Sequence, residues 1–203
     1  MTTADSTSTN LLIASAAAGD AKALELLLAG HREYLRRVVE VRLDPALRAR
    51  IDASDIVQEA LIAASDRIKD FLAARPTSFR IWLRRNAVER LVDARRRHLA
   101  HRRDVRRDLS ITDASSQLIA RGLLRNNACQ AVLRQELSDC VRGAILGLSD
   151  GDQEIILLRH AEGLSNAEAA EVLDVDPRAA SKRYGRALSR LLTELRKQGL
   201  KSL

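Results

Sequence analysis

The sequence predicts an all-α protein built from two small helical domains joined by a linker, with a helix-turn-helix in the C-terminal domain. Aromatic residues make up only 2% of the 203 residues, whereas hydrophobic residues make up 46%. The cores must therefore consist of Leu, Ile, Val and Ala, a mixture that suits helices better than sheets. Gly and Pro are few, and the alternation of polar and apolar residues that is typical of strands is almost absent.

Composition and pattern divide the chain into four segments. Residues 1–10 are rich in Ser and Thr and are expected to be disordered. Residues 11–107 and 137–203 carry helical apolar patterns and are expected to form the two domains. Residues 108–136 are polar and weakly patterned, so we expect a linker with some helical character.

The first domain is expected to contain helices over about residues 11–28, broken by Gly19-Asp20, and over about residues 31–43, 54–72 and 79–103. Gly30 separates the first two helices, and Ser54 is expected to cap the third. A loop over residues 73–78 leads to the fourth helix.

The helix over residues 54–72 has two different faces. Its apolar residues recur at helical spacing and predict a buried stripe: Ile56, Val57, Ala60, Leu61, Ala64, Ile68 and Phe71. The opposite face carries acidic and amide groups around an isoleucine: Asp55, Gln58, Glu59 and Ile62. This face is either a docking surface for a protein or the polar side that keeps a helix in solution, and the pattern leaves both open.

A second pattern, between residues 165 and 197, predicts two helices joined by a short turn. Ser165 and Glu168 have the spacing of a capping box, which predicts a helix start at Ser165. The helix should stop at Asp174. The three-residue turn Asp174-Val175-Asp176 follows, and Asp176 can cap a second helix that has Pro177 in its first turn. Two capped helices across such a turn are typical of a helix-turn-helix.

The second of these helices has two sharply different faces. One is apolar and is expected to pack inward: Ala180, Tyr184, Ala187, Leu188, Leu191 and Leu195. The other is cationic, hydroxylated or bare: Arg178, Ser181, Lys182, Gly185, Arg186 and Ser189. A face without bulky apolar groups admits a phosphate or a base edge, which favours DNA binding. The alternative is a solvated arginine-rich helix in an ordinary bundle.

Positive charge is concentrated in two stretches of the chain. The formal net charge is +7 and the isoelectric point is about 10.1, which indicates a polyanionic partner when the charge is clustered. Residues 84–107 contain ten arginines, and residues 177–197 contain seven basic residues. The segment 93–97 is expected to be too basic for burial and to follow DNA phosphates.

The sequence also argues against several classes of function. No apolar run approaches the roughly 20 residues that cross a bilayer, and no signal peptide is present, so we expect a cytoplasmic protein without a membrane partner. Cys129 and Cys140 give no disulfide pattern. His98 and His101 lack the neighbours of a tetrahedral metal site. With no nucleophile motif or phosphate loop, we expect neither an enzyme nor a bound metal or cofactor.

Three groups of residues together resemble a known family. They are Asp55-Ile56-Val57-Gln58-Glu59, then Phe79-Arg80-Ile81-Trp82-Leu83 with Asp93 and the arginine run, and then the stretch from Leu148 to Leu192. In this order and separation they are similar to the two conserved regions of bacterial RNA polymerase sigma factors of the extracytoplasmic-function type. The segment from Arg42 to Asp55 also resembles a subgroup known from planctomycete-like bacteria. The resemblance implies a factor that binds core RNA polymerase and directs promoter recognition and transcription initiation.

The resemblance implies a role for each matching surface. A docking face on the coiled coil of the largest polymerase subunit would be formed by Asp55, Gln58, Glu59 and Ile62. Loop 73–78 and the helix behind it would hold the minus-10 promoter element through Arg75, Arg90, Asp93, Arg95, Arg96 and Arg97. The last helix would read the minus-35 element through Arg178, Ser181, Lys182, Arg183 and Arg186.

Two positions depart from the family pattern. Glu89 stands where the family often has Asn, and it places a carboxylate near the expected minus-10 contacts. Asp174 stands where the family often has Gly, in a turn that needs a left-handed backbone. Asp tolerates that conformation better than most residues do.

Two other functions fit parts of the sequence. A stand-alone helix-turn-helix regulator would use the same C-terminal helices, but such proteins usually dimerise. No sustained heptads of a dimerisation helix are present, so we expect a monomer. A helical adaptor whose basic patches bind RNA or acidic proteins would show no preference for a duplex sequence. Core RNA polymerase and promoter DNA are the partners that we expect, and an anti-sigma factor is left open as a third.

Overall fold

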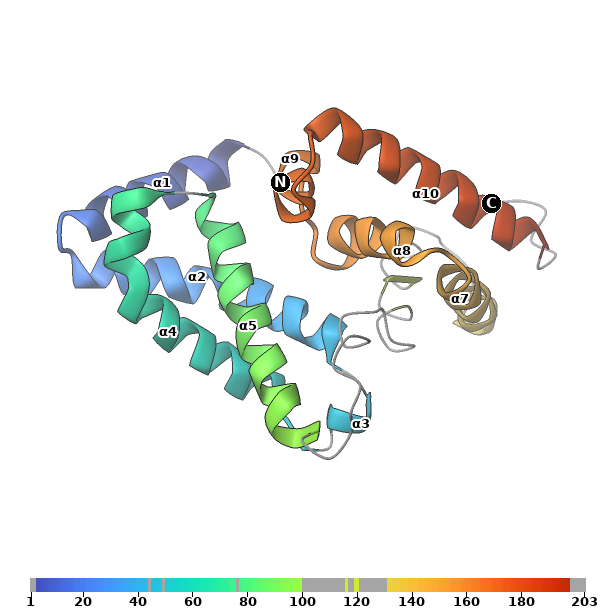
Figure 1. Cartoon of the computed structure of the whole chain (residues 1–203), viewed down its shortest axis with the longest axis horizontal. Helices are drawn as coiled ribbons and strands as arrows, with labels where there is room; N and C mark the ends of the chain where they lie inside the picture. The colour runs from blue at the N-terminus through green and yellow to red at the C-terminus, as the bar shows by residue number, and fades with distance from the viewer. Residues whose placement is uncertain are drawn as a thin grey trace. The chain divides into compact units, whose positions relative to one another are not determined.

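The computed structural model describes residues 3–43, 45–48, 50–75, 77–99, 116, 119–120 and 131–197. In these ranges all regular secondary structure is helical, which confirms the predicted fold class (Figure 1). The N-terminal helices are α1 (Thr3–Ala17), α2 (Ala21–Arg42), α3 (Pro45–Arg48), α4 (Ala53–Ala74) and α5 (Phe79–Leu99). The C-terminal helices are α7 (Ala131–Leu146), α8 (Asp150–Ile156), the π-helical turn η1 (Leu157–Ala161), α9 (Asn166–Leu173) and α10 (Pro177–Lys197).

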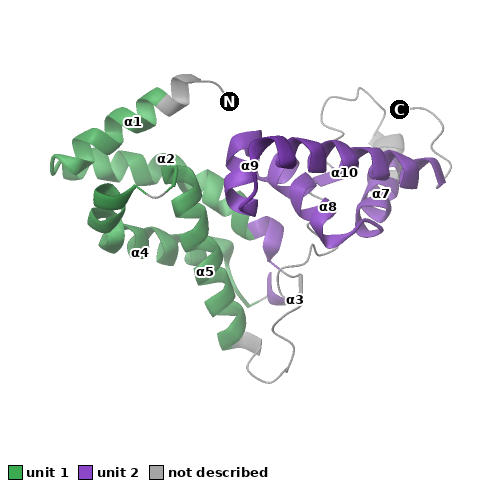
Figure 2. Ribbon diagram, turned by 45° about the horizontal axis from the view of Figure 1, so that its top comes forward, with its two compact units in different colours: residues 1–39, 50–99 green, residues 40–49, 100–203 purple. Residues whose placement is uncertain are grey.

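The chain forms two compact units, which Figure 2 draws in green and purple. Unit 1 takes residues 1–39 and 50–99, and unit 2 takes residues 40–49 and 100–203. The division crosses α2, because the last residues of that helix group with unit 2. Residues 40–49 lie within the predicted first domain, 11–107, whereas in the structure they group with unit 2. A helix that continues across the division shows no change of composition there, so the sequence carries no local signal of this boundary.

The core of unit 1 lies between α4 and α5, which pack along one another. The whole predicted stripe on α4 is buried: Ile56, Val57, Ala60, Leu61, Ala64, Ile68 and Phe71. At one end of this core, Phe71 stacks on Trp82 with 4.6 Å between ring centroids. Phe79 meets Phe71 edge-on at 5.5 Å, and His31 of α2 meets Phe79 at 5.2 Å. The aromatic cluster therefore joins three helices.

The N-terminal helices differ in three places from the sequence-based expectation. Residues 3–10 belong to α1, where composition predicted disorder. The helix α2 runs through Gly30 without a break, because this glycine does not adopt the positive φ that ends a helix. Asp52, and not Ser54, caps α4: its Oδ1 accepts from the Ser54 backbone N–H at 2.8 Å. Ser54 already lies inside the first turn.

Part of the predicted linker is packed. Ser116, Ile119 and Ala120 fall within residues 108–136, and all three have side chains that are 0% exposed. Their polar surroundings in the sequence did not indicate burial. Except for these three residues and 131–136 of α7, the predicted linker lies outside the described residues.

His31 makes the stability of unit 1 depend on pH. Burial lowers the pKa of His31 below its ordinary value, although the hydrogen bond from its Nδ1 to the Leu27 carbonyl oxygen, 2.8 Å long, opposes this shift. The nearby charge of Arg80 lowers the pKa further. The folded state therefore favours neutral His31, and this contribution to stability is complete above about pH 6.5 and is lost as the pH falls toward the folded-state pKa.

We therefore expect unit 1 to unfold at a lower urea concentration at about pH 5.5 than at about pH 7.5. Trp82 is the single tryptophan of the chain and lies in the aromatic cluster, so its fluorescence reports on this unit. His31→Phe keeps an aromatic ring beside Phe79 but cannot titrate, and should reduce the difference between the two pH values. A variant with the full wild-type difference would mean that another group carries the titration.

Candidate nucleic-acid interface

Both ends of α9 are fixed by hydrogen bonds to the backbone. Ser165 Oγ accepts from the Glu168 N–H at 3.2 Å, and Glu168 Oε2 accepts from the Ser165 N–H at 2.7 Å. The predicted capping box is therefore confirmed. Asp174 ends α9 with φ +53° and ψ +49°, the left-handed conformation expected for this position. Its N–H donates to the Ala170 carbonyl oxygen, which satisfies one of the free acceptors of the helix end.

The start of α10 is also defined by side-chain hydrogen bonds. Asp176 Oδ1 accepts from the Arg178 N–H at 2.8 Å, as its predicted capping role requires. Asn166 at the start of α9 donates from Nδ2 to the Pro177 carbonyl oxygen at 2.7 Å. This bond links the first turns of the two helices, so their relative orientation is set at the position where a DNA groove would receive α10.

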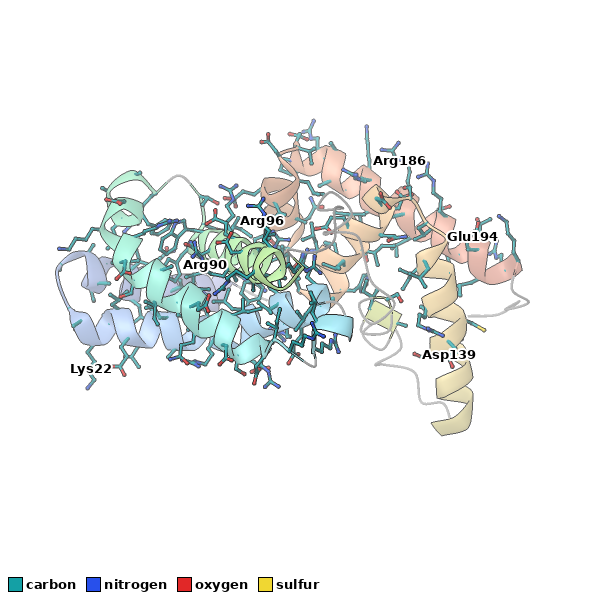
Figure 3. All side chains as sticks on the ribbon, turned by 60° about the horizontal axis from the view of Figure 1, so that its bottom comes forward. Lys22, Arg90, Arg96, Asp139, Arg186 and Glu194 are labelled. Atoms are coloured by element: carbon teal, nitrogen blue, oxygen red, sulfur yellow. The ribbon has the colours of Figure 1, made fainter. Side chains whose placement is uncertain are left out.

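The helix α10 separates its apolar and cationic residues onto two faces, as predicted. The buried side contacts α7, α8 and α9 and consists of Ala180, Ala187, Leu191 and Leu195, the apolar seam of this helix. The opposite side is exposed at every predicted position: Arg178, Ser181, Lys182, Gly185, Arg186 and Ser189. Arg186 points outward from α10 in Figure 3. We call this side the cationic face.

Tyr184 holds α10 against the π-helical turn η1. Its hydroxyl is hydrogen-bonded to Nε2 of His160 at 2.7 Å, and the Arg159 guanidinium lies 5.4 Å from its ring centroid. Burial lowers the pKa of His160, and the charge of Arg159 lowers it further, so the imidazole is neutral at neutral pH. A neutral imidazole nitrogen can accept a hydrogen bond from the tyrosine hydroxyl, which is consistent with a structural role for Tyr184.

An open pocket of about 360 Å³ lies beside the cationic face. Its lining comes from the start of α8 and from the turn and α10: Ser149, Gly151, Asp152, Val175, Ala179, Arg183, Arg186 and Arg190. Asp152 is ion-paired with Arg190 and accepts from the Ser149 hydroxyl at 2.9 Å. Burial alone would raise the pKa of Asp152, but the hydrogen bonds from Arg190 and Ser149 outweigh burial and hold the pKa below its ordinary value.

In unit 1 the candidate minus-10 residues do not share one environment. Arg96 and Arg97 are exposed on α5, and Arg90 is 3.6 Å from Asp93. Arg95 is only 4% exposed, so the expectation that this segment is too basic for burial is wrong at that position. Its neighbour Ala94 is buried as well, because α5 turns this side toward the core.

Arg75 and Glu89 are two further exposed residues of unit 1 near the candidate minus-10 residues in the sequence. Arg75 is exposed at the end of α4 and has φ +39°, a left-handed conformation that is uncommon for a residue with a side chain. Glu89 lies 3.7 Å from Arg67 of α4, and both side chains are 57% exposed. The carboxylate at this unusual position therefore has a basic partner within the protein.

The predicted docking face on α4 is fully accessible. Asp55, Gln58, Glu59 and Ile62 are all exposed, and Ile62 keeps 57% of its surface in contact with solvent. Glu59 also forms an ion pair with Arg97 of α5, with 3.1 Å between Oε2 and Nη2. A single exposed isoleucine is normal on a protein surface, so the accessibility of this face agrees both with docking and with a solvated helix.

Unit 2 contains a buried ionic group that the sequence pattern does not indicate. Arg42 is 5% exposed and donates to Glu162, which is 0% exposed, and to Glu154 at 2.9 Å. Burial opposes the charge of Arg42, but the two carboxylates outweigh burial and hold its pKa above the ordinary value. The partners lie more than 100 residues apart in the sequence, so no local spacing could have revealed them.

Within the described ranges, every helix is too short or too polar to span a bilayer. The same ranges hold no group of three or more His, Cys, Asp and Glu side chains that is arranged to bind a metal ion. Cys140 is a free thiol. His101 and Cys129 lie outside the described residues, as does the side chain of His98.

Comparison with known proteins assigns both units to one family. The family "Sigma-70 region 2" matches residues 30–101, and "Sigma-70, region 4" matches residues 138–191. RNA polymerase sigma factor CnrH of Cupriavidus metallidurans is 31% identical over 185 residues, which cover 89% of this chain and 91% of CnrH. The chain belongs to the sigma-70 family of RNA polymerase sigma factors. It is of the extracytoplasmic-function type, since the ECF sigma factor SigW of Bacillus subtilis is 31% identical over 71% of this chain and 76% of SigW.

The solved structure of CnrH in complex with the cytosolic domain of CnrY has the same fold as this sigma factor, with a TM-score of 0.55 and 26% identity. The match covers 94% of this chain and 98% of the other. The sigma factor therefore directs promoter recognition by RNA polymerase. The regulator and adaptor alternatives lose their support, because neither explains the match to region 2. The resemblance to a planctomycete-like subgroup stays a prediction.

Two substitutions test the backbone of the helix-turn-helix. Asp174→Gly should raise the free energy of unfolding by about 0.5 kcal/mol, because glycine adopts the left-handed conformation without steric cost. Gly163→Ala should lower it by about 1–2 kcal/mol, since Gly163 has φ +66° and its added Cβ would meet open space, which leaves only the backbone cost. Urea unfolding followed by far-ultraviolet circular dichroism measures both. Equal signs for the two variants would contradict this explanation.

Proposed function

We propose that α10 reads the minus-35 promoter element with its cationic face, while the exposed face of α4 docks on the coiled coil of the largest subunit of core RNA polymerase. The observation that carries this proposal is the separation of charge on α10. Burial of the apolar seam leaves Arg178, Lys182 and Arg186 on one exposed side, where base edges and phosphates of a major groove can reach them.

In the proposed minus-35 interface, the residues assigned are Arg178, Ser181, Lys182, Arg183 and Arg186. Arginine can donate two hydrogen bonds to one guanine, so a guanidinium at the centre of the helix is suited to base recognition. The hydroxyl of Ser181 can donate to a phosphate or accept from a base. Gly185 leaves space between these side chains for close approach of the DNA.

In the proposed minus-10 interface, the residues assigned are Arg75, Arg90, Asp93, Arg95, Arg96 and Arg97. The exposed Arg96 and Arg97 suit phosphate contacts, and Arg75 is exposed at the end of α4. Arg95, which is buried, would act by holding α5 in place. Promoter opening requires only that unpaired bases are captured, at a cost of a few kcal/mol per base, so the chain needs no catalytic group.

The proposed division of labour follows the two regions of the family. Residues 11–107 would bind the polymerase and the minus-10 element, residues 108–136 would connect, and residues 137–203 would bind the minus-35 element. The protein would work as a monomer in the cytoplasm. The bound polymerase would set the distance between the two DNA sites, so that both domains can bind at once. The CnrH structure contains the cytosolic domain of CnrY. By analogy, an anti-sigma protein would bind this chain too.

Run-off transcription with purified core polymerase tests the proposal. Core enzyme with this protein should give a transcript of defined length from promoter-containing DNA, and core enzyme alone should not. Ile62→Ala should reduce transcript yield and weaken binding to core polymerase by about 1–2 kcal/mol, because residues at the desolvated centre of an interface carry most of its binding energy.

Leu26→Ala is the matched control for Ile62→Ala. Leu26 is a large apolar residue of α2 that is 54% exposed, close to the 57% of Ile62. The Leu26→Ala variant should bind core polymerase as the wild type does. If both variants bind core polymerase as the wild type does, α4 does not provide the docking face.

Arg186→Ala tests base recognition. If Arg186 contacts a base, the variant should lose about 1–3 kcal/mol of binding to the minus-35 duplex and should discriminate less at one position of that element. Fluorescence anisotropy with substituted duplexes measures both effects. Arg37→Ala, an exposed arginine on α2, removes the same charge from unit 1 and should change neither. Unchanged sequence preference in Arg186→Ala would contradict the assignment of the reading face.

A further inference from the structure

Arg183 differs from the other cations at the start of α10. Arg178, Lys182 and Arg186 are exposed, whereas Arg183 is only half-exposed and lines the pocket between α10 and the start of α8. Its guanidinium lies over Gly151 of α8. A Cβ atom added at Gly151 would lie 3.1 Å from Cζ of Arg183 and would overlap Nη2. The guanidinium therefore occupies the space that any side chain at position 151 would fill.

The same pocket orients a second arginine. Arg190 is ion-paired with Asp152, whose carboxylate also accepts from the Ser149 hydroxyl. Arg186 lies on the pocket wall between Arg183 and Arg190 in the sequence. Three arginines and one carboxylate line this pocket, which leaves two net positive charges (three minus one) on the flank of α10. Such a flank attracts an anion strongly, and Asp152 fixes one arginine without neutralising the group.

We propose that Gly151 is a positioning residue for Arg183, and that the positioned guanidinium binds a backbone phosphate of the upstream promoter DNA and not a base. The proposal rests on the proposed role of α10 and refines it. The centre of a recognition helix faces base edges, while its flanks face the phosphates that line the groove. Arg183 lies on the flank, so its contact would fix register and would carry no sequence information.

Gly151→Ala tests the proposal because it moves the Arg183 guanidinium without changing the charge of the protein. Alanine at 151 collides only with the far end of a flexible side chain, so it displaces the guanidinium and leaves the backbone in place. Alanine also favours a helix more than glycine does. Gly151→Ala should therefore keep or raise the thermal stability of the chain while it weakens DNA binding. A merely structural role of Gly151 would lower both.

Binding of the full-length chain is measured by fluorescence anisotropy on two probes over a series of salt concentrations. One probe is a duplex enriched from a random pool by the wild-type protein, and the other is the unselected pool of the same length. Gly151→Ala should weaken binding to both probes by the same factor, about threefold to tenfold, and should lower the salt slope by about one counterion. Arg183→Ala should match it, and the double variant should show no further loss.

Gly30→Ala is the control, because Gly30 is a helical glycine of α2 whose added Cβ would meet open space. It should leave binding to both probes unchanged. Three results for Gly151→Ala would overturn the proposal: wild-type affinity and salt slope, a changed preference between the two probes, or a lower unfolding temperature. An unchanged salt slope in Arg183→Ala would overturn it as well. A wild type that enriches no duplex would instead count against base reading by α10, while the unselected pool still tests Gly151.

Discussion

Burial of the apolar seam of α10 is the constraint on which the rest of the C-terminal unit depends. Leu191 and Leu195 are 4% and 3% exposed against the preceding helices. Full burial of one such side chain contributes about 1.5–3 kcal/mol, whereas an exposed ion pair contributes about 0–1 kcal/mol. The orientation of α10 is therefore determined by its apolar side. The arginines of the cationic face contribute little to folding, so their positions are available for contacts with DNA.

The turn before α10 converts this packing into a defined geometry. A buried seam alone would allow the helix to slide or tilt, because apolar contacts have little directional preference. Hydrogen bonds do have direction. The left-handed backbone at Asp174 and the bond from Asn166 to Pro177 hold α9 and α10 in one relative arrangement. Recognition of a DNA groove requires both contributions. Burial determines which face of α10 is exposed, and the turn determines the angle between α9 and α10.

Features with local causes could be predicted from the sequence, and features with distant causes could not. The start and the two faces of α10 follow from a cap, a proline and a 3.6-residue period, all of which lie within the helix or directly before it. Arg95 looked like its basic neighbours, but its burial depends on where α5 faces the core. Arg42 and its carboxylate partners are joined only by the fold. The same holds for Gly151, whose lack of a side chain has meaning only because Arg183 lies above it.

The ion pair between Glu59 and Arg97 joins two surfaces that are usually considered separately. Glu59 belongs to the α4 face and Arg97 to the basic side of α5, and their charged atoms are 3.1 Å apart. Any replacement of Glu59 therefore also alters the electrostatic surroundings of Arg97, so the effect of a substitution on the α4 face includes a change on the basic side of α5.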